Sequence, residues 1–261
     1  MIMKEKIKAV VREIGADDVG FAAVDAYRSS RSPQIKSILP SAKTLVVLAF
    51  KELSHLESDN KNIAAGGRLI SKGFTDSCVY RLGRFLEREY GARAVMVTAS
   101  TPVDMNTTTK GLVAEVSLRH AAIAAGLGSF GRHNLIIHPK LGSRVLFNAV
   151  ITDLELSADP PFVEKLCTDC GKCVSNCPGG ALVEEGKTLA SECLRNSQPH
   201  NLGGFMRFLN ELLSSNSDEQ RQITKDVRLW KLYQALASGA QRECFNCMRF
   251  CPVGQDTKVS H

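Results

Sequence analysis

The sequence has few of the features that would place the protein in a membrane. Its 261 residues include no apolar stretch approaching the roughly 20 residues that a bilayer-spanning helix needs. Residues 1–15 also lack the uninterrupted apolar core of a signal peptide, because charged residues divide them. We therefore expect a cytoplasmic protein without membrane contact, in a reducing setting where cysteines bind metal instead of pairing as disulfides.

Cysteine, in contrast, is abundant and patterned. Eight of the nine cysteines lie in the last third of the chain, in two motifs and at one single position. The first motif is a C-x2-C-x2-C-x3-C-P run, typical of bacterial 4Fe–4S ferredoxins, at Cys167, Cys170, Cys173 and Cys177. The second motif is C-x2-C-x3-C-P, at Cys244, Cys247 and Cys251, and the lone Cys193 lies between the two motifs.

The spacing predicts which cysteines share a cluster. Three thiolates on one tight loop can hold three corners of an iron–sulfur cube, and the cysteine before proline serves the neighbouring cluster. We therefore assign the first cluster to Cys167, Cys170, Cys173 and Cys251. The second cluster takes Cys177, Cys244 and Cys247, with Cys193 as the spare cysteine nearby. Two zinc sites are the alternative, because C-x2-C pairs also bind zinc.

A concentrated basic stripe is also missing, although the formal net charge is +6. The basic residues are scattered, whereas a nucleic-acid-binding surface gathers them. Eight thiolates contribute −8 and two oxidised 4Fe–4S cores return +4, which leaves a net charge of about +2. The charge therefore gives little support to a polyanionic partner.

The first 160 residues alternate helical patterns with short apolar runs. We expect helices at about 3–14, 75–90 and 117–125, and strands at about 19–24, 44–50, 94–97, 134–137 and 144–152. Gly91 is a predicted C-cap, and Cys78 is expected to be a small buried hydrophobe. This alternation predicts a layered α/β or α+β domain over 1–160, and consecutive prolines mark the boundary to a second domain over 161–261.

The glycines of residues 126–131 match G-x-G-x-x-G in letter only. They follow a predicted helix and precede a predicted strand, whereas a dinucleotide site needs the strand first and the helix afterwards. A Rossmann site is therefore rejected. Two interpretations stay open: a glycine C-cap with a turn, or glycines that let a flat cofactor approach the backbone closely.

Several segments resemble one family. Residues 125–143 (AGLGSFGRHNLIIHPKLGS), continuing to 152–156 (TDLEL), resemble the epoxyqueuosine reductases, cobalamin-dependent iron–sulfur enzymes related to the reductive dehalogenases. Residues 38–49 (ILPSAKTLVVLA) are similar to an early segment of that family, and the order of the eight cysteines matches as well. The resemblance runs from about residue 30 to Pro252. It implies a nitroreductase-like cobalamin-binding sandwich followed by a ferredoxin-like domain with two 4Fe–4S clusters.

The resemblance also implies where a corrin would lie, along the 126–134 loop and the 138–143 turn. The cofactor-binding residues carried over by position are Gly126, Gly128, Gly131, Arg132, Asn134, Ile136, His138, Gly142, Ser143 and Phe147. A base-off corrinoid of this class usually has no protein histidine below cobalt. We therefore expect His138 to make a structural hydrogen bond. Electrons from a low-potential donor of the ferredoxin or flavodoxin type would pass through the clusters to cobalt.

Two features depart from the family. Its proposed proton-donating aspartate falls at Leu112 in this sequence, and Glu115, three residues further on, is a candidate catalytic substitute. The sequence ends nine residues after Pro252, without the helical repeats that help the family hold tRNA. Both departures make tRNA an unexpected substrate.

Fifty residues separate Cys193 from Cys244, which is a long insertion at about 200–240. Helical apolar patterns at about 203–214 and 218–237 predict either a packed pair of helices that covers the clusters or a lid or docking surface for an electron donor.

The leading hypothesis is a cobalamin-dependent oxidoreductase with two 4Fe–4S clusters, acting on a small molecule or a protein-bound cofactor. The alternative is a non-catalytic electron-transfer protein or a reductive activator of a partner's corrinoid, which the missing aspartate supports. A third hypothesis replaces cobalamin with a flavin, since the implied sandwich belongs to a flavin-binding superfamily. The sequence leaves open which cluster lies nearer the cobalt.

The assignment of Cys193 can be tested directly. In Cys193→Ala we expect the iron of one cluster to be lost and the other cluster to be kept, about four irons of about eight, because each cluster takes four thiolates. The measurement is iron content after anaerobic purification, with Cys78→Ala as the control that should keep all the iron. Retention of about eight irons in Cys193→Ala contradicts the assignment.

Overall fold

A four-stranded antiparallel sheet forms the centre of the fold. A computed structural model describes residues 3–99 and 112–254. The strand order is β1 (Asp18–Ala23), β2 (Thr44–Lys51), β6 (Val145–Thr152) and β3 (Ala94–Val97). The two central strands, β2 and β6, pair along their full lengths and are buried almost throughout. Their nearly continuous apolar sequences follow from this, since both of their faces are covered by protein.

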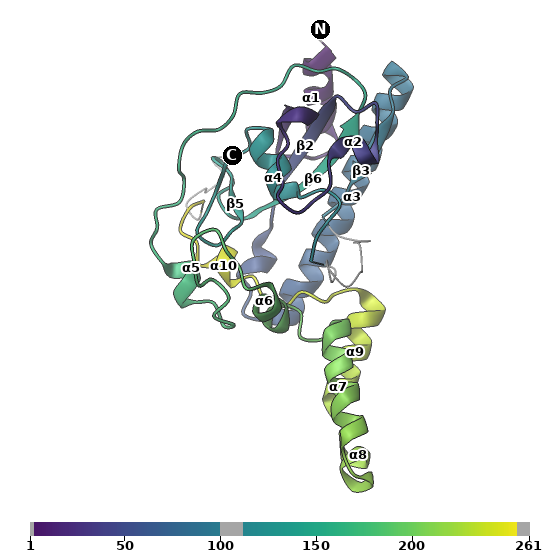
Figure 1. The fold of residues 1–261 in the computed structure, drawn as a ribbon, viewed down its shortest axis with the longest axis vertical. Coiled ribbons are helices and arrows are strands. Elements are labelled where there is room, and N and C mark those ends of the chain that lie inside the picture. Colours follow the sequence, from purple (N-terminus) through teal and green to yellow (C-terminus); the bar gives the residue numbers. More distant parts are fainter. Residues whose placement is uncertain (1–2, 100–111, 255–261) are drawn as a thin grey trace.

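Alternate residues of these strands enter two separate cores. Leu45 and Val47 face one core, to which α4 (Leu118–Ala124) and α2 (Ile35–Ile38) contribute. Val46 and Leu48 face the other, which is closed by α1 (Met3–Glu13) and α3 (Lys61–Tyr90). Figure 1 shows the sheet between these helices. The two-residue period of a strand produces the two layers of core, and the predicted α+β sandwich is confirmed.

Helix α3 is twice as long as its sequence pattern indicates. The helix predicted over 75–90 corresponds to the second half of α3, and its predicted end at Gly91, which has a φ of +63°, is confirmed. The predicted start at residue 75 was wrong. The side chain of Asn60 accepts hydrogen bonds from the backbone N–H groups of Asn62 and Ile63 and so caps the helix fourteen residues earlier. Cys78 in this helix is fully buried, as expected, and burial raises the pKa of its thiol.

A small hairpin and a turn follow α4 and connect to the central sheet. Strands β4 (Ser129–Phe130) and β5 (Ile136–Ile137) pair antiparallel, and an isolated bridge joins His138 to Gly142 just before β6 begins. The predicted strand over 134–137 is therefore shorter than expected. The strand predicted at 144–152 is confirmed almost to the residue.

Short helices carry the cysteines of the C-terminal part. They are α5 (Lys172–Ser175), α6 (Ala190–Ser197) and α10 (Asn246–Arg249). Between α6 and α10 the chain forms an arm of three helices, α7 (Leu202–Ser214), α8 (Ser217–Ile223) and α9 (Val227–Ser238). Two short 3-10 helices, η1 (Val24–Ala26) and η2 (Ser54–Glu57), complete the described elements.

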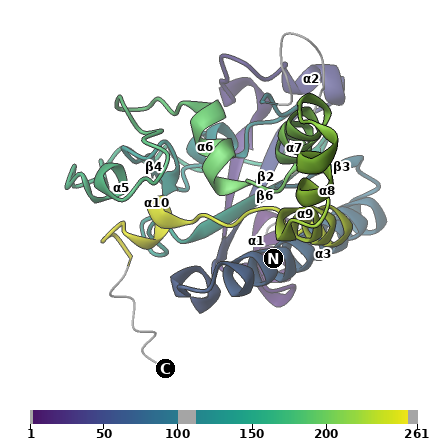
Figure 2. The ribbon, with the colours of Figure 1, turned by 90° about the horizontal axis from the view of Figure 1, so that it is seen from below.

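The arm corrects two expectations. The single helix predicted over 218–237 is two helices, because the side chain of Asp226 caps α9 by accepting a hydrogen bond from the backbone N–H of Arg228. The arm also does not cover the cysteines. Phe208 and Leu232 are buried where α7 and α9 pack together, but the arm extends away from α5 and α10 in both views (Figures 1 and 2). Within the described residues, no helix has the length and apolar character needed to cross a bilayer.

The sheet's contribution to stability can be measured with one pair of variants. Leu48→Ala removes a side chain that is fully buried in the centre of β2, and we expect it to lower the free energy of unfolding by about 2–5 kcal/mol. Leu53→Ala, just beyond the same strand, changes a leucine that is 65% exposed and should cost less than about 0.5 kcal/mol. Urea denaturation of both variants, followed by far-UV circular dichroism, checks this. Equal losses would contradict the assignment of the core.

Candidate functional site

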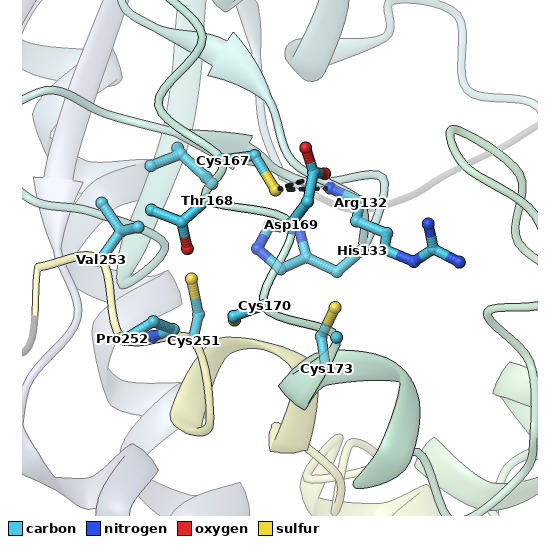
Figure 3. Close-up of a pocket in the computed structure, with 12 residues that line it drawn as sticks. Arg132, His133, Cys167, Thr168, Asp169, Cys170, Cys173, Cys251, Pro252 and Val253 are labelled. Carbon is cyan, nitrogen blue, oxygen red and sulfur yellow. Dashed lines mark hydrogen bonds between the residues drawn. The ribbon is translucent and has the colours of Figure 1, made fainter.

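The four cysteines assigned to the first cluster, here called the first set, surround one small open cavity. Figure 3 shows the sulfurs of Cys167, Cys170, Cys173 and Cys251 arranged around it. Cys167 and Cys170 lie on the loop before α5, where Gly171, at a φ of +71°, turns the chain into the helix, and Cys173 lies in the helix itself. Cys251 lies two residues after the end of α10, almost eighty residues later. The fold thus closes the set with the remote cysteine that the spacing indicates.

The pKa of Cys173 reflects the other three cysteines of the first set. Burial raises the pKa of Cys173, and Cys167, Cys251 and Cys170 each raise it further. Four thiolates this close repel one another, so their ionisation needs a compensating cation such as iron. The backbone N–H of Arg132 donates a hydrogen bond to the Cys167 sulfur at 3.4 Å, the kind of contact that tunes iron–sulfur clusters.

The four cysteines assigned to the second cluster, here called the second set, lie within electrostatic range of Cys247. Burial raises the pKa of Cys247 to about 12, and Cys244, Cys193 and Cys177 each add to the rise, while Arg242 opposes it. Cys193 reaches this group from α6, and Cys177 from the turn after α5. The backbone N–H of Ala181 donates to the Cys177 sulfur at 3.3 Å. The structure brings together both groups of four; their role as cluster ligands stays a prediction.

The arrangement of the sulfurs bears on the zinc alternative. A tetrahedral zinc needs four sulfurs at about 2.3 Å from one centre. Within residues 3–99 and 112–254, no three Cys, His, Asp or Glu side chains converge closely enough to hold one metal ion. A 4Fe–4S cluster takes one thiolate on each iron and so suits sulfurs that surround a cavity. The donor set therefore fits two clusters better than two zinc ions.

One buried arginine, absent from the sequence-based predictions, connects the cysteines to the sandwich. Arg144 is 8% exposed and immediately precedes β6. Its guanidinium pairs with Glu57 and donates hydrogen bonds to the backbone carbonyls of Arg249 and Cys251, the latter at 3.0 Å. Ser143 beside it donates to the carbonyl of Met248. The sequence does show a charged residue directly before an apolar strand, which could have marked Arg144 as a residue of interest. Nothing in the sequence indicates which groups Arg144 contacts.

Three glycines were expected to let a corrin lie close to the backbone. In this structure they lie close to other parts of the protein backbone instead. A Cβ on Gly126 would lie 2.3 Å from the Pro160 carbonyl oxygen, and one on Gly128 would lie 2.1 Å from that of Ile137. On Gly142 it would lie 2.1 Å from the Val253 carbonyl oxygen. All three have positive φ angles. In this structure the C-cap and turn interpretation accounts for their contacts.

His138 is held by protein contacts, as expected. It is fully buried, and its Nδ1 accepts hydrogen bonds from the backbone N–H groups of Lys140 and Leu141. Its Nε2 lies 3.3 Å from the carboxylate of Asp18. His138 and the Val19 N–H lower the pKa of Asp18 to about 2. These contacts fix the 138–143 turn against β1.

The ten residues implied to bind a corrin fit that role only in part. Gly126, Arg132 and Asn134 are partly exposed, and Asn134 has an unusual φ of +58°. The other seven are buried against protein: Gly128, Gly131, Ile136, His138, Gly142, Ser143 and Phe147.

The candidate catalytic residue also lies outside the cysteine sites. Glu115 is exposed, and Leu112, at the position of the family's aspartate, is 43% exposed. Neither lines the cavity of the first set. Residues 100–111, immediately before them, lie outside the described residues.

Comparisons with known proteins agree with the fold and with the cysteine pattern. Residues 160–183 match the family model of the 4Fe–4S binding domain. The epoxyqueuosine reductase of Bacillus subtilis (strain 168) is 26% identical over 220 residues, which cover 74% of this chain and 54% of the relative. A crystal structure of a selenomethionine-labelled epoxyqueuosine reductase matches with a TM-score of 0.61 at 21% identity, covering 97% of this chain and 66% of that one.

A reductive dehalogenase described in connection with B12-dependent dehalogenation matches with a TM-score of 0.58 at 19% identity, over 92% of this chain and 38% of that one. The chain spans about half the length of the curated relatives that it matches most extensively. Its resemblance to the epoxyqueuosine reductases in sequence, and to both groups in fold, is thereby confirmed.

Proposed function

We propose that the protein is an iron–sulfur reductase that passes electrons through two 4Fe–4S clusters to a cobalamin. One observation carries the proposal: two cysteine motifs separated by more than sixty residues, together with Cys193 between them, fold into two groups of four thiols, each with members from both motifs. Interlocked motifs of this kind place two clusters side by side, which suits electron transfer between them.

The position of each group suggests a direction for the electrons. The cavity of the first set is also lined by Arg132, His133 and Ile137, which belong to the segment where the resemblance locates the corrin. The second set instead lies beside an open cleft of about 670 Å³, lined by Cys244 and by residues of η2 and α3. We infer that a ferredoxin- or flavodoxin-type donor reduces the second cluster and that the first cluster delivers the electron onward.

When bound, cobalamin would supply a strongly reducing metal for the chemical step. The contribution of this chain is to hold the two clusters in sequence and to pack them against the sandwich through Arg144. We propose that the substrate is a small molecule or a protein-bound cofactor in the cytoplasm, not tRNA. The support is Leu112, an apolar residue at the position of the family's proton-donating aspartate.

A second candidate function is an electron carrier or a reductive activator of a partner's corrinoid. It is favoured by the burial of seven of the ten implied corrin-binding residues and by the exposed position of Glu115. In this case the protein would hold the clusters, and the acceptor would belong to another protein. A flavin in place of cobalamin is the third possibility and would give a yellow protein without cobalt.

Metal analysis of anaerobically purified protein distinguishes these functions. After incubation with cobalamin and removal of the excess, we expect about eight irons and one cobalt per chain, with a base-off corrin spectrum. An untreated sample from cells grown without cobalamin is the control and should hold iron alone. About eight irons per chain without cobalt, after incubation with cobalamin, would reject the cobalamin-dependent reductase and favour the electron carrier. Zinc in place of iron would contradict both.

A further inference from the structure

A histidine lines the cavity of the first cysteine set and has a role that the sequence did not suggest. His133 is 4% exposed and lies among the four cysteines that surround the cavity. Figure 3 shows its imidazole between Cys167 and Cys170, with its ring directed into the space that the sulfurs enclose.

The hydrogen bonding of His133 determines where its proton lies. The backbone N–H of Leu135 donates to Nδ1 at 3.1 Å, so Nδ1 presents a lone pair. The ring hydrogen must then be on Nε2, which makes Nε2 a donor. Among the residues that the structure describes, this buried Nε2 has no hydrogen-bond partner. A buried donor without an acceptor is costly, so the atom is expected to meet an acceptor that occupies the cavity.

The surrounding loop leaves the ring little freedom to turn elsewhere. The backbone N–H of Gly131 donates to the Leu135 carbonyl, and that of Asn134 donates to the Gly131 carbonyl. A Cβ on Gly131 would lie 2.7 Å from Cε1 of His133. A glycine is therefore needed at this position for the ring to lie where it does.

We infer that His133 donates its Nε2–H to a sulfur of the first cluster, either a cysteine thiolate or an inorganic sulfide. The inference rests on the proposed function, because it requires a cluster at Cys167, Cys170, Cys173 and Cys251. Reduction adds one electron to the cluster, and the proton stays on the imidazole. A hydrogen bond to sulfur stabilises the more negative reduced form and so raises the reduction potential. His133 is thus a positioning and tuning residue that favours electron flow from the second cluster to the first.

Two measurements on the protein with both clusters test this. The first is a redox titration followed by electron paramagnetic resonance, on wild type, His133→Phe and His133→Gln. We expect the potential of one cluster to fall in His133→Phe and that of the other to stay unchanged. His133→Gln keeps an N–H donor and should restore part of the shift. His120→Phe is the matched control, since His120 is a half-buried histidine bonded to Ser117, outside the cavity, and should change neither potential.

The second measurement uses the wild-type protein alone and therefore does not depend on the folding of a variant. Electron–nuclear double resonance of the reduced wild-type protein, in H2O and D2O, should show an exchangeable proton coupled to one cluster, with nitrogen coupling when the histidines are labelled with ¹⁵N. Absence of that histidine-linked proton overturns the inference. Strong nitrogen coupling without the proton, which indicates an Fe–N bond, also overturns it. The inference is also overturned if the reduction potentials of both clusters are unchanged in a His133→Phe variant that keeps its full iron content. A wild-type protein without iron would instead refute the proposed function.

Discussion

The cysteine sites depend on how the segment around α10 docks against the turn before β6. Arg144 is buried at this contact, and its guanidinium finds acceptors in two backbone carbonyls of the docked segment and in the Glu57 carboxylate. Gly142 allows the backbone of Val253 and Gly254 to lie against it. Because a buried guanidinium is costly without such partners, the sandwich and the docked segment stabilise one another. Cys251 is carried into the first set by this docking.

Because the docked segment carries Cys251, metal binding at the first set would be coupled to folding. Burial and the neighbouring cysteines raise the pKa values of Cys173 and Cys247, which favours the protonated, uncharged thiols at these two positions when no metal is bound. Iron would supply the positive charge that lets all four thiolates of a set coexist, and its binding energy would be added to folding. The sheet, whose cores contain none of the eight clustered cysteines, provides a scaffold that does not require metal.

Much of this could be predicted from local patterns. The apolar runs located β2 and β6, because that signal lies within a few residues of chain. The cysteine spacing indicated which motif cysteines group together, and Cys193 was added as the spare cysteine nearby. The start of α3 at Asn60 and the cap at Asp226 were missed, since one side chain decides each of them. The partners of Arg144 and the position of His133 beside the first cysteine set depend on contacts between distant segments, which no local pattern contains. The resemblance named corrin-binding positions that this structure mostly buries.

The central claim is that each cluster takes ligands from both cysteine motifs. A crystal structure of the anaerobically purified protein, with anomalous diffraction data at the iron edge, tests it most directly. We predict two iron sites, one bound by Cys167, Cys170, Cys173 and Cys251, and the other by Cys177, Cys193, Cys244 and Cys247. A single cluster bound by the four cysteines of residues 167–177, with Cys251 remote from iron, would contradict this ligand assignment.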